Sequence, residues 1–572
     1  MTRFALLLLV ASCAKSDGVK LPDAGDDDDA PIVTTGPTPE APVESGDLGD
    51  MILPEIIATP PGCTFNNSVE VILETPADPD ADIWFTTDGS APQIGVGNLY
   101  AGPTMITQSV QIRAIAEVSG QLVGTSPTYL SLDPGLDGFS SDIPLVVLWS
   151  QRAAPTTKLE TYEKFTMSVF EPPQGGRIDF PSDATLSVRS GLRVRGSSSS
   201  GFEKKPYRLE SWDPIDPLDV DMDVELLGMP AEADWVFLSP LVFDRALMRN
   251  ALIYQLSNNI NRYAPRTRFA EVFVAEWGEV LGLDDYKGVY VILERVERDA
   301  DRVALTRLEA TDIALPELSG GYIFKEDRLG PGDQGFVAGD GGGAFDFEQP
   351  FVFSEPSEAE IQPEQYIYMR DLIDELGDAL VQPNFTNPVT GRHYDQIVDV
   401  DSFIDHHILN VFTKNPDAFR LSGYFHKDRD GLLMAGPIWD FDRTMGCADD
   451  SRAGNPTWWD PSNETNDCTF VFEHGLWLGF FNDPVFRTRY FQRWDDLLLS
   501  DLSLASVGAV IDDMEAELAE AAPRNFSAWP GYPPRGGSFE SEVNMLRVWV
   551  QDRHAWVTNC LALPDPRSCI GT

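Results

Sequence analysis

Two aspartates interrupt an otherwise apolar run in the stretch IWDFDRTMG (438–446). The run predicts a strand, in which Asp440 and Asp442 share one face and aromatic side chains lie on the other. Two carboxylates side by side in an apolar layer are costly unless a cation or hydrogen-bond donors lie between them. The pair therefore predicts either a hard metal ion or a basic partner such as Arg443.

A second polar segment precedes this one, in the stretch FTKNPDAFR (412–420). The pattern predicts a loop after a helix, and the loop carries Asn415 and Asp417. In protein kinases a loop aspartate accepts the proton of the acceptor hydroxyl, and a later aspartate holds magnesium. Asp417 and Asp440 follow the same order along this chain, which is compatible with phosphoryl transfer.

A third stretch, RVRGSSSSGFEKKPYRLE (193–210), predicts two strands joined by a loop rich in glycine and serine. Backbone N–H groups, hydroxyls and adjacent ammonium groups in such a loop can hold phosphates. The same pattern equally fits a basic surface hairpin. Glu294 ends the apolar run of YKGVYVILERVERD and is expected to orient one of the lysines. The candidate nucleotide-binding residues are Arg195, Gly196, Ser197, Lys204, Lys205 and Glu294.

Alternating apolar runs and amphipathic segments around these stretches predict a mixed domain of strands and helices. Strands are expected at IPLVVLW, LRVRGSSS, KPYRLESW, DWVFLSP, AEVFVAEW and GVYVILERV. Helices are expected at RALMRNALIYQLSNNI, PEQYIYMRDLIDELGDAL, VDSFIDHHILNVFTK and 500–520. Asp244 is the expected N-cap of the first of these helices.

Residues 51–133 alternate short β-rich runs with turn residues, which predicts a small all-β sandwich. The strings IWFTTDGSAP, LYAGP and VQIRAIA resemble the chitobiase/β-hexosaminidase C-terminal domain, an immunoglobulin-like accessory module. The turn at Asp88 and Gly89 is expected to be a structural hairpin device. We assign no chemistry to this module, the alternative being sugar contact through Trp84.

The first residues, MTRFALLLLVASCAKSDG, have the form of an export signal, and VASC resembles the lipobox of bacterial lipoproteins. The resemblance implies a signal peptide over 1–13, lipidation of Cys13, and attachment to the outer membrane or the cell surface. The alternative is an ordinary secretory signal. Residues 14–50 are acidic and rich in proline and glycine, which predicts a disordered tether.

The chain has 572 residues and a net charge of -49, from 42 basic and 91 acidic residues. So acidic a protein lacks the basic surface that nucleic acids require, so nucleic acid is excluded as a partner. Five more cysteines follow Cys13 in the sequence. Export would place them outside the cytoplasm, where disulfides persist. Proximity in sequence favours bonds between Cys447 and Cys468 and between Cys560 and Cys569, with Cys63 left over. The alternative is a zinc site made of Cys447, Cys468 and His474.

From about 143 to 555 the chain resembles the CotH kinase family of atypical protein kinases. The carrying stretches are RVRGSSSSGFEKKPYRLE, ADWVFLSPLVFDRALMRNAL, GVYVILERV and KNPDAFRLSGYFHKDRDGLLMAGPIWDFDRTMG. The resemblance implies an α+β kinase-like domain over 140–560 that uses ATP with Mg²⁺ or Mn²⁺. Asp440 matches the magnesium-binding aspartate and Asp417 the catalytic one, with Asp442 and Asn415 as supporting ligands. AFRLSGYF departs from the asparagine-rich run common at that place in the family.

The expected function is transfer of the ATP γ-phosphoryl group to Ser or Thr of an envelope or surface protein, by a lipid-anchored enzyme. One alternative is a surface scaffold or adhesion protein that keeps a kinase-like domain without turnover. Glycan hydrolysis is a third possibility, and it depends only on the accessory module and the abundance of carboxylates. The sequence does not indicate an oligomeric state.

Overall fold

The computed structural model describes residues 53–151, 155–159, 161–330, 332–338, 349–357, 359–460, 471–473 and 475–569. Residues Pro54–Thr572 form one compact unit. The expected signal peptide with Cys13, and the expected tether, lie outside the described residues. Within the described part of the chain, no helix combines the length and apolar character needed to cross a bilayer.

The N-terminal part of this unit is all-β and contains three small sheets, ordered β1-β3-β6, β2-β10-β7 and β5-β4-β8-β9. Apolar side chains of these strands, among them Val71, Ala114 and Tyr129, are buried together as their core. The strands are β1 (Ile57–Thr59), β2 (Cys63–Phe65), β3 (Val69–Glu74), β4 (Trp84–Thr86), β5 (Asn98–Leu99), β6 (Thr104–Ile106), β7 (Val110–Gln111), β8 (Arg113–Val118), β9 (Gln121–Thr125) and β10 (Thr128–Ser131).

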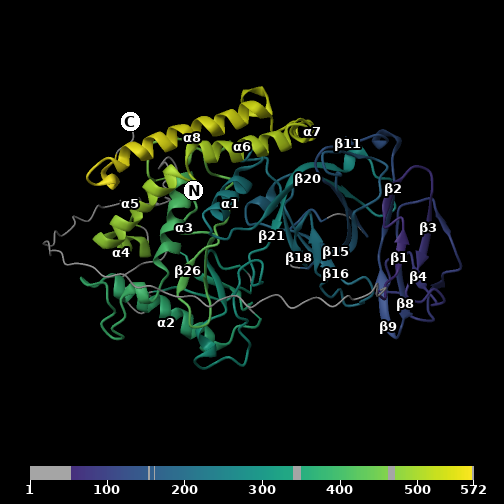
Figure 1. Cartoon of the computed structure of the whole chain (residues 1–572), viewed down its shortest axis with the longest axis horizontal. Coiled ribbons are helices and arrows are strands. Elements are labelled where there is room, and N and C mark those ends of the chain that lie inside the picture. The colour runs from purple at the N-terminus through teal and green to yellow at the C-terminus, as the bar shows by residue number, and fades with distance from the viewer. Residues whose placement is uncertain are drawn as a thin grey trace, which may run out of the picture. The chain divides into compact units, whose positions relative to one another are not determined.

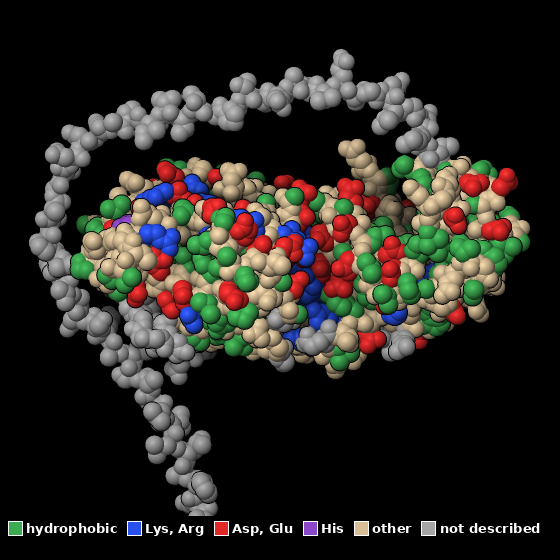
Figure 2. All heavy atoms as spheres, turned by 90° about the horizontal axis from the view of Figure 1, so that it is seen from below, with side chains coloured by type: hydrophobic (Ala, Val, Ile, Leu, Met, Phe, Trp, Pro, Cys, Tyr) green, Lys and Arg blue, Asp and Glu red, His purple; other side chains and the backbone are tan. Residues whose placement is uncertain are grey.

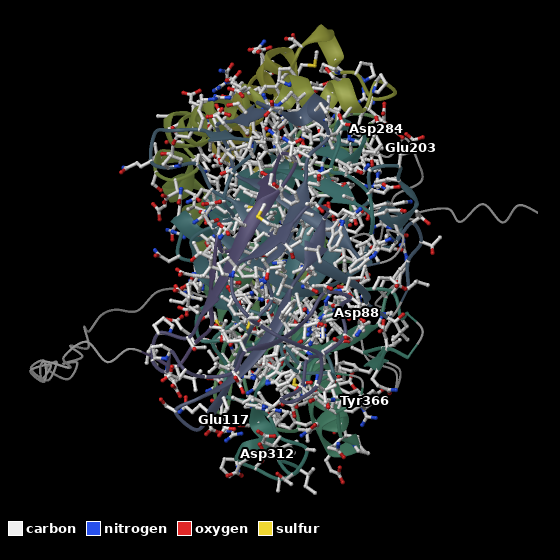
Figure 3. The ribbon with its side chains drawn as sticks, turned by 90° about the vertical axis from the view of Figure 1, so that its right-hand side faces the viewer. Asp88, Glu117, Glu203, Asp284, Asp312 and Tyr366 are labelled. Carbon is white, nitrogen blue, oxygen red and sulfur yellow. A yellow bond between two sulfur atoms is a disulfide. The ribbon has the colours of Figure 1, made fainter. Side chains whose placement is uncertain are left out.

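The turn after β4 is a local hydrogen-bonded structure. The carboxylate of Asp88, labelled in Figure 3, accepts the backbone N–H of Ser90 at 3.0 Å. Gly89 has a φ of 78°, which a residue without Cβ adopts at little cost. The bond to Ser90 uses the Asp88 side chain within the turn, as expected of a structural device.

The next part of the chain closes a seven-stranded barrel in the order β12-β13-β15-β16-β19-β21-β20. All six strands expected from apolar alternation belong to it. Its interior is filled by side chains such as Leu148, Leu209, Trp235 and Ile292, so the barrel is a packed core. The strands are β12 (Leu145–Ser150), β13 (Glu163–Phe170), β15 (Leu186–Val194), β16 (Tyr207–Trp212), β19 (Asp234–Leu238), β20 (Thr267–Ala275) and β21 (Tyr286–Glu294).

A five-stranded antiparallel sheet, ordered β23-β24-β22-β25-β26, follows in the sequence. The rings of Phe324 and Phe425 stack on each other, and the ring of Phe351 contacts both edge to face. Tyr366, labelled in Figure 3, donates its hydroxyl to the carbonyl of Gly335 at 3.1 Å and so ties a helix to this sheet. The strands are β22 (Tyr322–Glu326), β23 (Gly335–Phe336), β24 (Phe351–Glu355), β25 (Gly423–Lys427) and β26 (Leu433–Ala435). Two strand pairs stand apart: β11 (Ser140–Ser141) with β14 (Ile178–Asp179), and β17 (Val224–Leu226) with β18 (Met229–Glu232).

The helices pack around one large apolar cluster that includes Leu409, Phe412, Tyr490 and Trp494. In Figure 1 the long helix α8 lies beside α6, and α7 reaches the barrel at β21. The helices are α1 (Arg249–Asn259), α2 (Pro363–Leu380), α3 (Val400–Thr413), α4 (Leu476–Asn482), α5 (Pro484–Leu499), α6 (Leu504–Leu518), α7 (Ala521–Ala528) and α8 (Phe539–Leu561).

The start of α1 differs from the expectation. Its N-cap is Met248 and not Asp244, because Leu247 adopts a φ of 63° and delays the first helical turn. Asp244 serves the helix in another way: its carboxylate accepts the backbone N–H of Arg249 at 2.8 Å and a guanidinium N–H of the same residue at 2.7 Å.

Candidate functional site

A cleft of about 870 Å³ collects the segments that carry the predicted chemistry. In a chain with so large a negative charge, basic side chains are concentrated in its walls, and Figure 2 shows Lys and Arg gathered among Asp and Glu on one face. A polyanionic ligand fits such a lining. The charged lining residues are Lys158, Arg193, Arg195, Arg208, Lys325, Arg328, Arg420, Arg443, Arg452, Asp244, Asp327, Asp333, Asp417, Asp440 and Asp442.

Asp440 does not lie on a strand, so that expectation was wrong. Strand β26 ends at Ala435, and Pro437, which has no N–H for a sheet ladder, follows. Asp440 itself has a φ of 69°, in the left-handed region. Helix α1 fixes this segment, because the N–H of Asp440 donates to the hydroxyl of Tyr254 at 3.2 Å. The next N–H, of Phe441, donates to the side-chain oxygen of Asn250 at 2.7 Å.

The structure nevertheless brings Asp440 and Asp442 together in the cleft. Burial, followed by repulsion from Asp417, raises the pKa of Asp440 above its ordinary value. Burial, followed by repulsion from Asp440, raises the pKa of Asp442 well above its ordinary value. Among the described residues neither carboxylate forms an ion pair. The charge of Arg195 acts to lower the pKa of Asp440, but burial and the neighbouring carboxylate outweigh it. The pair is therefore only partly compensated by positive charge.

Arg443, the expected alternative partner, lies close enough for its charge to oppose the rise of both pKa values. Its guanidinium, however, forms its ion pair with Asp450, at 3.3 Å, and lies 3.8 Å from the ring centroid of Phe243. Direct neutralisation of Asp440 or Asp442 by a contact with Arg443 is therefore not what the structure shows.

The two carboxylates fit the requirements of magnesium. In the described part of the chain, no group of three or more His, Cys, Asp or Glu side chains is placed to hold a metal ion. Magnesium, however, commonly uses only one or two protein carboxylates and completes its shell with water and substrate phosphates. Asp440 and Asp442, in a cleft lined by basic side chains, match that donor set.

Asp417 lies in the same cleft, in a loop after α3. One oxygen of its carboxylate, Oδ1, accepts from Arg420 at 3.0 Å and from Arg452 at 3.3 Å. Asn415 was expected to be a metal ligand but does not line the cleft, and its side-chain amide is already in use. It donates to the carbonyl of Asp440 and accepts the N–H of Asp417, so its place in the structure is that of a positioning residue.

Part of the predicted phosphate loop lines the cleft, where Arg195, Gly196 and Ser197 are found. The guanidinium of Arg195 stands 5.3 Å from the ring centroid of Trp439, and burial lowers its pKa. Among the described residues it has no ion-pair partner. An arginine held this way is suited to a phosphate group, which supplies the missing negative charge.

Lys204, by contrast, points away from the cleft. Its ammonium donates to the carbonyl of Pro240 at 3.3 Å, to the side-chain oxygen of Asn525 at 2.8 Å and to the carbonyl of Val289. Burial lowers its pKa well below the ordinary value. Its contacts with Val289 of β21 and Asn525 of α7 place the ammonium between the barrel and that helix. Lys204 therefore has a structural place.

The other two predicted nucleotide-binding residues also lie outside the cleft lining. Lys205 donates to the carbonyl of Ser200, within its own loop, at 2.9 Å. Glu294 is buried and forms ion pairs with Arg266 and Arg302 rather than with a lysine. It also accepts the hydroxyl of Tyr263 at 3.1 Å, which uses its second oxygen.

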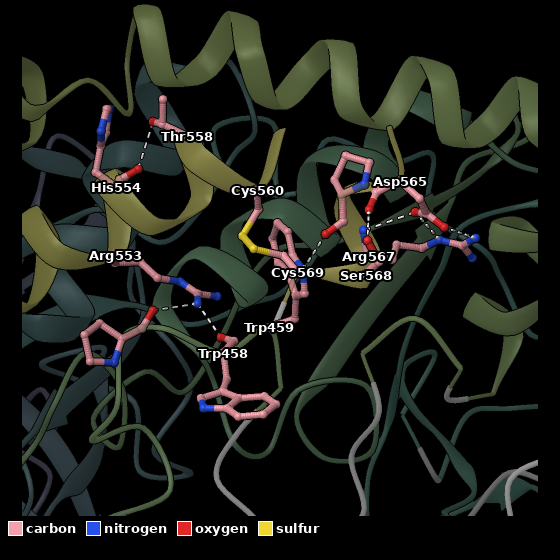
Figure 4. Close-up of a disulfide and its surroundings, with 12 residues drawn as sticks. Trp458, Trp459, Arg553, His554, Thr558, Cys560, Asp565, Arg567, Ser568 and Cys569 are labelled. Atoms are coloured by element: carbon pink, nitrogen blue, oxygen red, sulfur yellow. Dashed lines mark hydrogen bonds and ion pairs between the residues drawn. A yellow bond between two sulfur atoms is a disulfide. The ribbon is translucent and has the colours of Figure 1, made fainter. Parts of the chain in front are cut away.

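The expected disulfides have different outcomes. Cys560 and Cys569 are bonded, and beside them the indole N–H of Trp459 donates to the carbonyl of Pro566 at 3.0 Å (Figure 4). Cys447 is a free, buried thiol that donates weakly to the carbonyl of Asp450, so the expected bond to Cys468 is not formed. Cys468 and His474, the other members of the alternative zinc site, lie outside the described residues.

Sequence reasoning missed Arg452 as a lining residue of the cleft, and it considered Arg443 only as a partner of the aspartate pair. Arg443 and Arg452 both line the cleft, and both are bound to Asp450. The only sequence signal was the density of charged residues in DFDRTMGCADDSR, immediately after the aspartate pair. Charge density alone does not show which side chains turn inward.

Comparison with known families supports both resemblances. The family described as CotH kinase protein matches residues 192–557, which is more than half of the chain. The chitobiase/beta-hexosaminidase C-terminal domain matches residues 59–128. Comparison with curated proteins finds no significant match. The first match includes the barrel strands β16, β19, β20 and β21, the five-stranded sheet, and Asp417, Asp440 and Asp442 of the cleft. The chain therefore belongs to the CotH kinase family.

Proposed function

We propose that this chain transfers the γ-phosphoryl group of ATP to a Ser or Thr hydroxyl of another protein. The observation that carries the proposal is the pair Asp440 and Asp442, whose pKa values stay raised and which forms no ion pair among the described residues. It shares one cleft with Arg195, whose guanidinium likewise forms no ion pair there. A divalent cation bound to nucleotide phosphates would supply positive charge to the two carboxylates. The phosphates would supply negative charge to the guanidinium of Arg195.

Asp417 is the residue we assign to the acceptor. Both of its ion pairs use Oδ1, and its second oxygen has no hydrogen bond among the described residues. In the reaction the hydroxyl oxygen forms a bond to the γ-phosphorus, the bond from that phosphorus to the bridging oxygen of ADP breaks, and the hydroxyl proton passes to Asp417. The electron pair of the broken bond leaves with ADP.

Asp440 and Asp442 would hold Mg²⁺ or Mn²⁺. When bound, such an ion neutralises phosphate charge as it develops on the leaving ADP. Asn415 keeps the backbones of Asp440 and Asp417 in register, so that the cation side and the acceptor side of the cleft stay at a fixed separation.

The expected acceptor is a protein of the bacterial envelope or surface, reached by an enzyme that is tethered through lipidated Cys13. Support for this part of the proposal is the lipobox-like VASC and the acidic segment behind it. The alternative, a scaffold or adhesion protein without turnover, keeps the same anchor and accessory module and requires no nucleotide.

Calorimetric titration of the full-length protein with ATP, with and without Mg²⁺ or Mn²⁺, tests the proposal. We expect binding that requires the metal, followed by phosphate transfer to a Ser- or Thr-containing protein. Asp417→Asn should retain nucleotide affinity and lose transfer, because the group acts mainly in the transition state. No metal-dependent ATP binding by the wild type would favour the scaffold.

A further inference from the structure

A single carboxylate behind the cleft holds two of its arginines. The side chain of Asp450 is 8% exposed and does not line the cleft. Its oxygens accept Nε of Arg452 at 3.0 and 3.2 Å and Nη2 of the same residue at 2.7 Å. Nη1 of Arg443 lies 3.3 Å away. Asp450 therefore contacts both arginines without itself lining the cleft.

Each of these two arginines also contacts a residue that lines the cleft. Nη1 of Arg452 donates to Oδ1 of Asp417 at 3.3 Å. Nη2 of Arg443 lies 3.5 Å from the hydroxyl oxygen of Ser198, in the loop between β15 and β16. The resulting chain of contacts runs from the residue assigned to the acceptor, through Asp450, to the loop assigned to the phosphates.

The state of Asp450 suits this position. Burial acts to raise its pKa, but the hydrogen bonds and charge of Arg452, together with the charge of Arg443, hold that pKa below its ordinary value. The carboxylate thus stays ionised and keeps its hold on both guanidinium groups. A guanidinium has five donors in a fixed plane, so Arg443 retains donors for a ligand after its contacts with Asp450 and Ser198.

We propose that Asp450 is a positioning residue that aims Arg443 and Arg452 at the phosphoryl group as it moves from ATP to the acceptor. The inference depends on the proposed phosphoryl transfer and deepens it. Arg452 stands between Asp417 and Asp450, so it is placed on the acceptor side, while Arg443 is placed on the side of the phosphate loop. Fixed cations at the point where charge moves stabilise the transition state of such a transfer.

The contrasting view is that Asp450 only braces the turn between 447 and 455. A brace would affect stability and leave the preference of the site for ATP over ADP unchanged. Cations aimed at the transferred group contact the γ-phosphate, which ADP lacks. The ratio of ATP affinity to ADP affinity therefore distinguishes the two roles.

The test is calorimetry of the full-length protein with Mg²⁺ and either ATP or ADP, together with transfer assays and melting temperatures. Asp450→Asn should lower transfer about 10- to 100-fold, the range for loss of an outer partner that orients a site. It should also reduce the ATP preference while ADP affinity stays near its starting value. The matched control is Asp449→Asn, since Asp449 pairs with Arg245 and does not line the cleft.

Arg452→Lys is a second variant, which keeps the test decisive if Asp450→Asn does not fold. It keeps the positive charge but loses the planar guanidinium that binds Asp450. We expect it to show the same loss of ATP preference at a near-normal melting temperature. If Asp450→Asn and Arg452→Lys both fold and keep the wild-type ratio of ATP to ADP affinity, the inference is wrong and the proposed function stands. If the wild type binds neither nucleotide, both are wrong.

Discussion

The side-chain amide of Asn415 donates to the backbone carbonyl of Asp440 across 3.3 Å. The oxygen of the same amide accepts the N–H of Asp417 at 3.1 Å, and its nitrogen also donates to the side chain of Asn410 at 3.1 Å. One buried side chain therefore joins the backbone of the cation side of the cleft to the backbone of the acceptor side.

Asn415→Ala should remove this joint. Three hydrogen bonds are lost in a buried place, so we expect the free energy of unfolding to fall by about 1–3 kcal/mol. Transfer should fall more than nucleotide affinity, because the separation of Asp417 from Asp440 is no longer fixed. Urea unfolding and calorimetry measure the two effects. A variant with wild-type stability and wild-type transfer would contradict the role given to Asn415.

Asp440→Asn should weaken metal-dependent nucleotide binding by about tenfold or more, equivalent to at least ~1.4 kcal/mol. The melting temperature of the metal-free protein should stay the same or rise, because the change removes a carboxylate whose ionisation is opposed by burial and by Asp417. No arginine is orphaned, since Arg443 pairs with Asp450.

Thermal unfolding and calorimetry on Asp440→Asn check both expectations, with Asp513→Asn on the exposed face of α6 as the control. Unchanged metal-dependent ATP binding in Asp440→Asn would remove the metal role from this residue. A large fall in melting temperature would instead indicate a structural partner for its carboxylate.

Arg195→Met and Lys204→Met should have opposite consequences. Arg195 lines the cleft without an ion-pair partner among the described residues, so its loss should weaken ATP binding with little change in stability. Lys204 holds three oxygens in the interior, so its loss should lower the free energy of unfolding by about 1–3 kcal/mol or more and leave nucleotide affinity intact. The reverse pattern would restore Lys204 to the nucleotide site.

Acid should act on the protein partly through His406. Burial lowers the pKa of this side chain from 6.5 to about 4. Between about pH 6.5 and pH 4 the unfolded chain therefore binds a proton at His406 and the folded chain does not. The contribution of this group to the free energy of unfolding is fully present above about pH 6.5 and is lost as the pH falls toward 4. The loss has a limiting slope of about 1.4 kcal/mol per pH unit.

His406→Phe should abolish that contribution, since a phenyl ring has no proton to bind and His406 already lies beside Phe419 and Phe425. The difference in unfolding free energy between variant and wild type should be constant above pH 7 and shift in favour of the variant on acidification. Parallel stability curves from pH 7 to pH 4 would show that His406 does not titrate as expected.

Much of the framework was predictable from local pattern. Six barrel strands followed from apolar alternation, and α2 and α3 followed from their helical periodicity. The bond between Cys560 and Cys569 was predictable because its partners are close in sequence.

The geometry of the site was less predictable, because distant residues decide it. Alternation in IWDFD is typical of a strand, yet Tyr254 and Asn250 on α1 accept the N–H groups of Asp440 and Phe441, and Asp440 adopts a left-handed φ. Two adjacent lysines look alike in sequence, and only the position of α7 shows that Lys204 is taken into the interior. Metal and phosphate residues can thus be nominated from sequence, while their orientation depends on the assembled fold.

The burial of Cys63 and Cys447 limits thiol–disulfide exchange in the folded protein. Burial raises the pKa of each thiol to about 12, so neither forms appreciable thiolate near neutral pH. Thiolate is the species that attacks a disulfide, and exchange therefore needs it. In the folded protein, Cys63 and Cys447 therefore attack the bond between Cys560 and Cys569 only slowly. The pairing of that disulfide is protected from exchange with either free thiol.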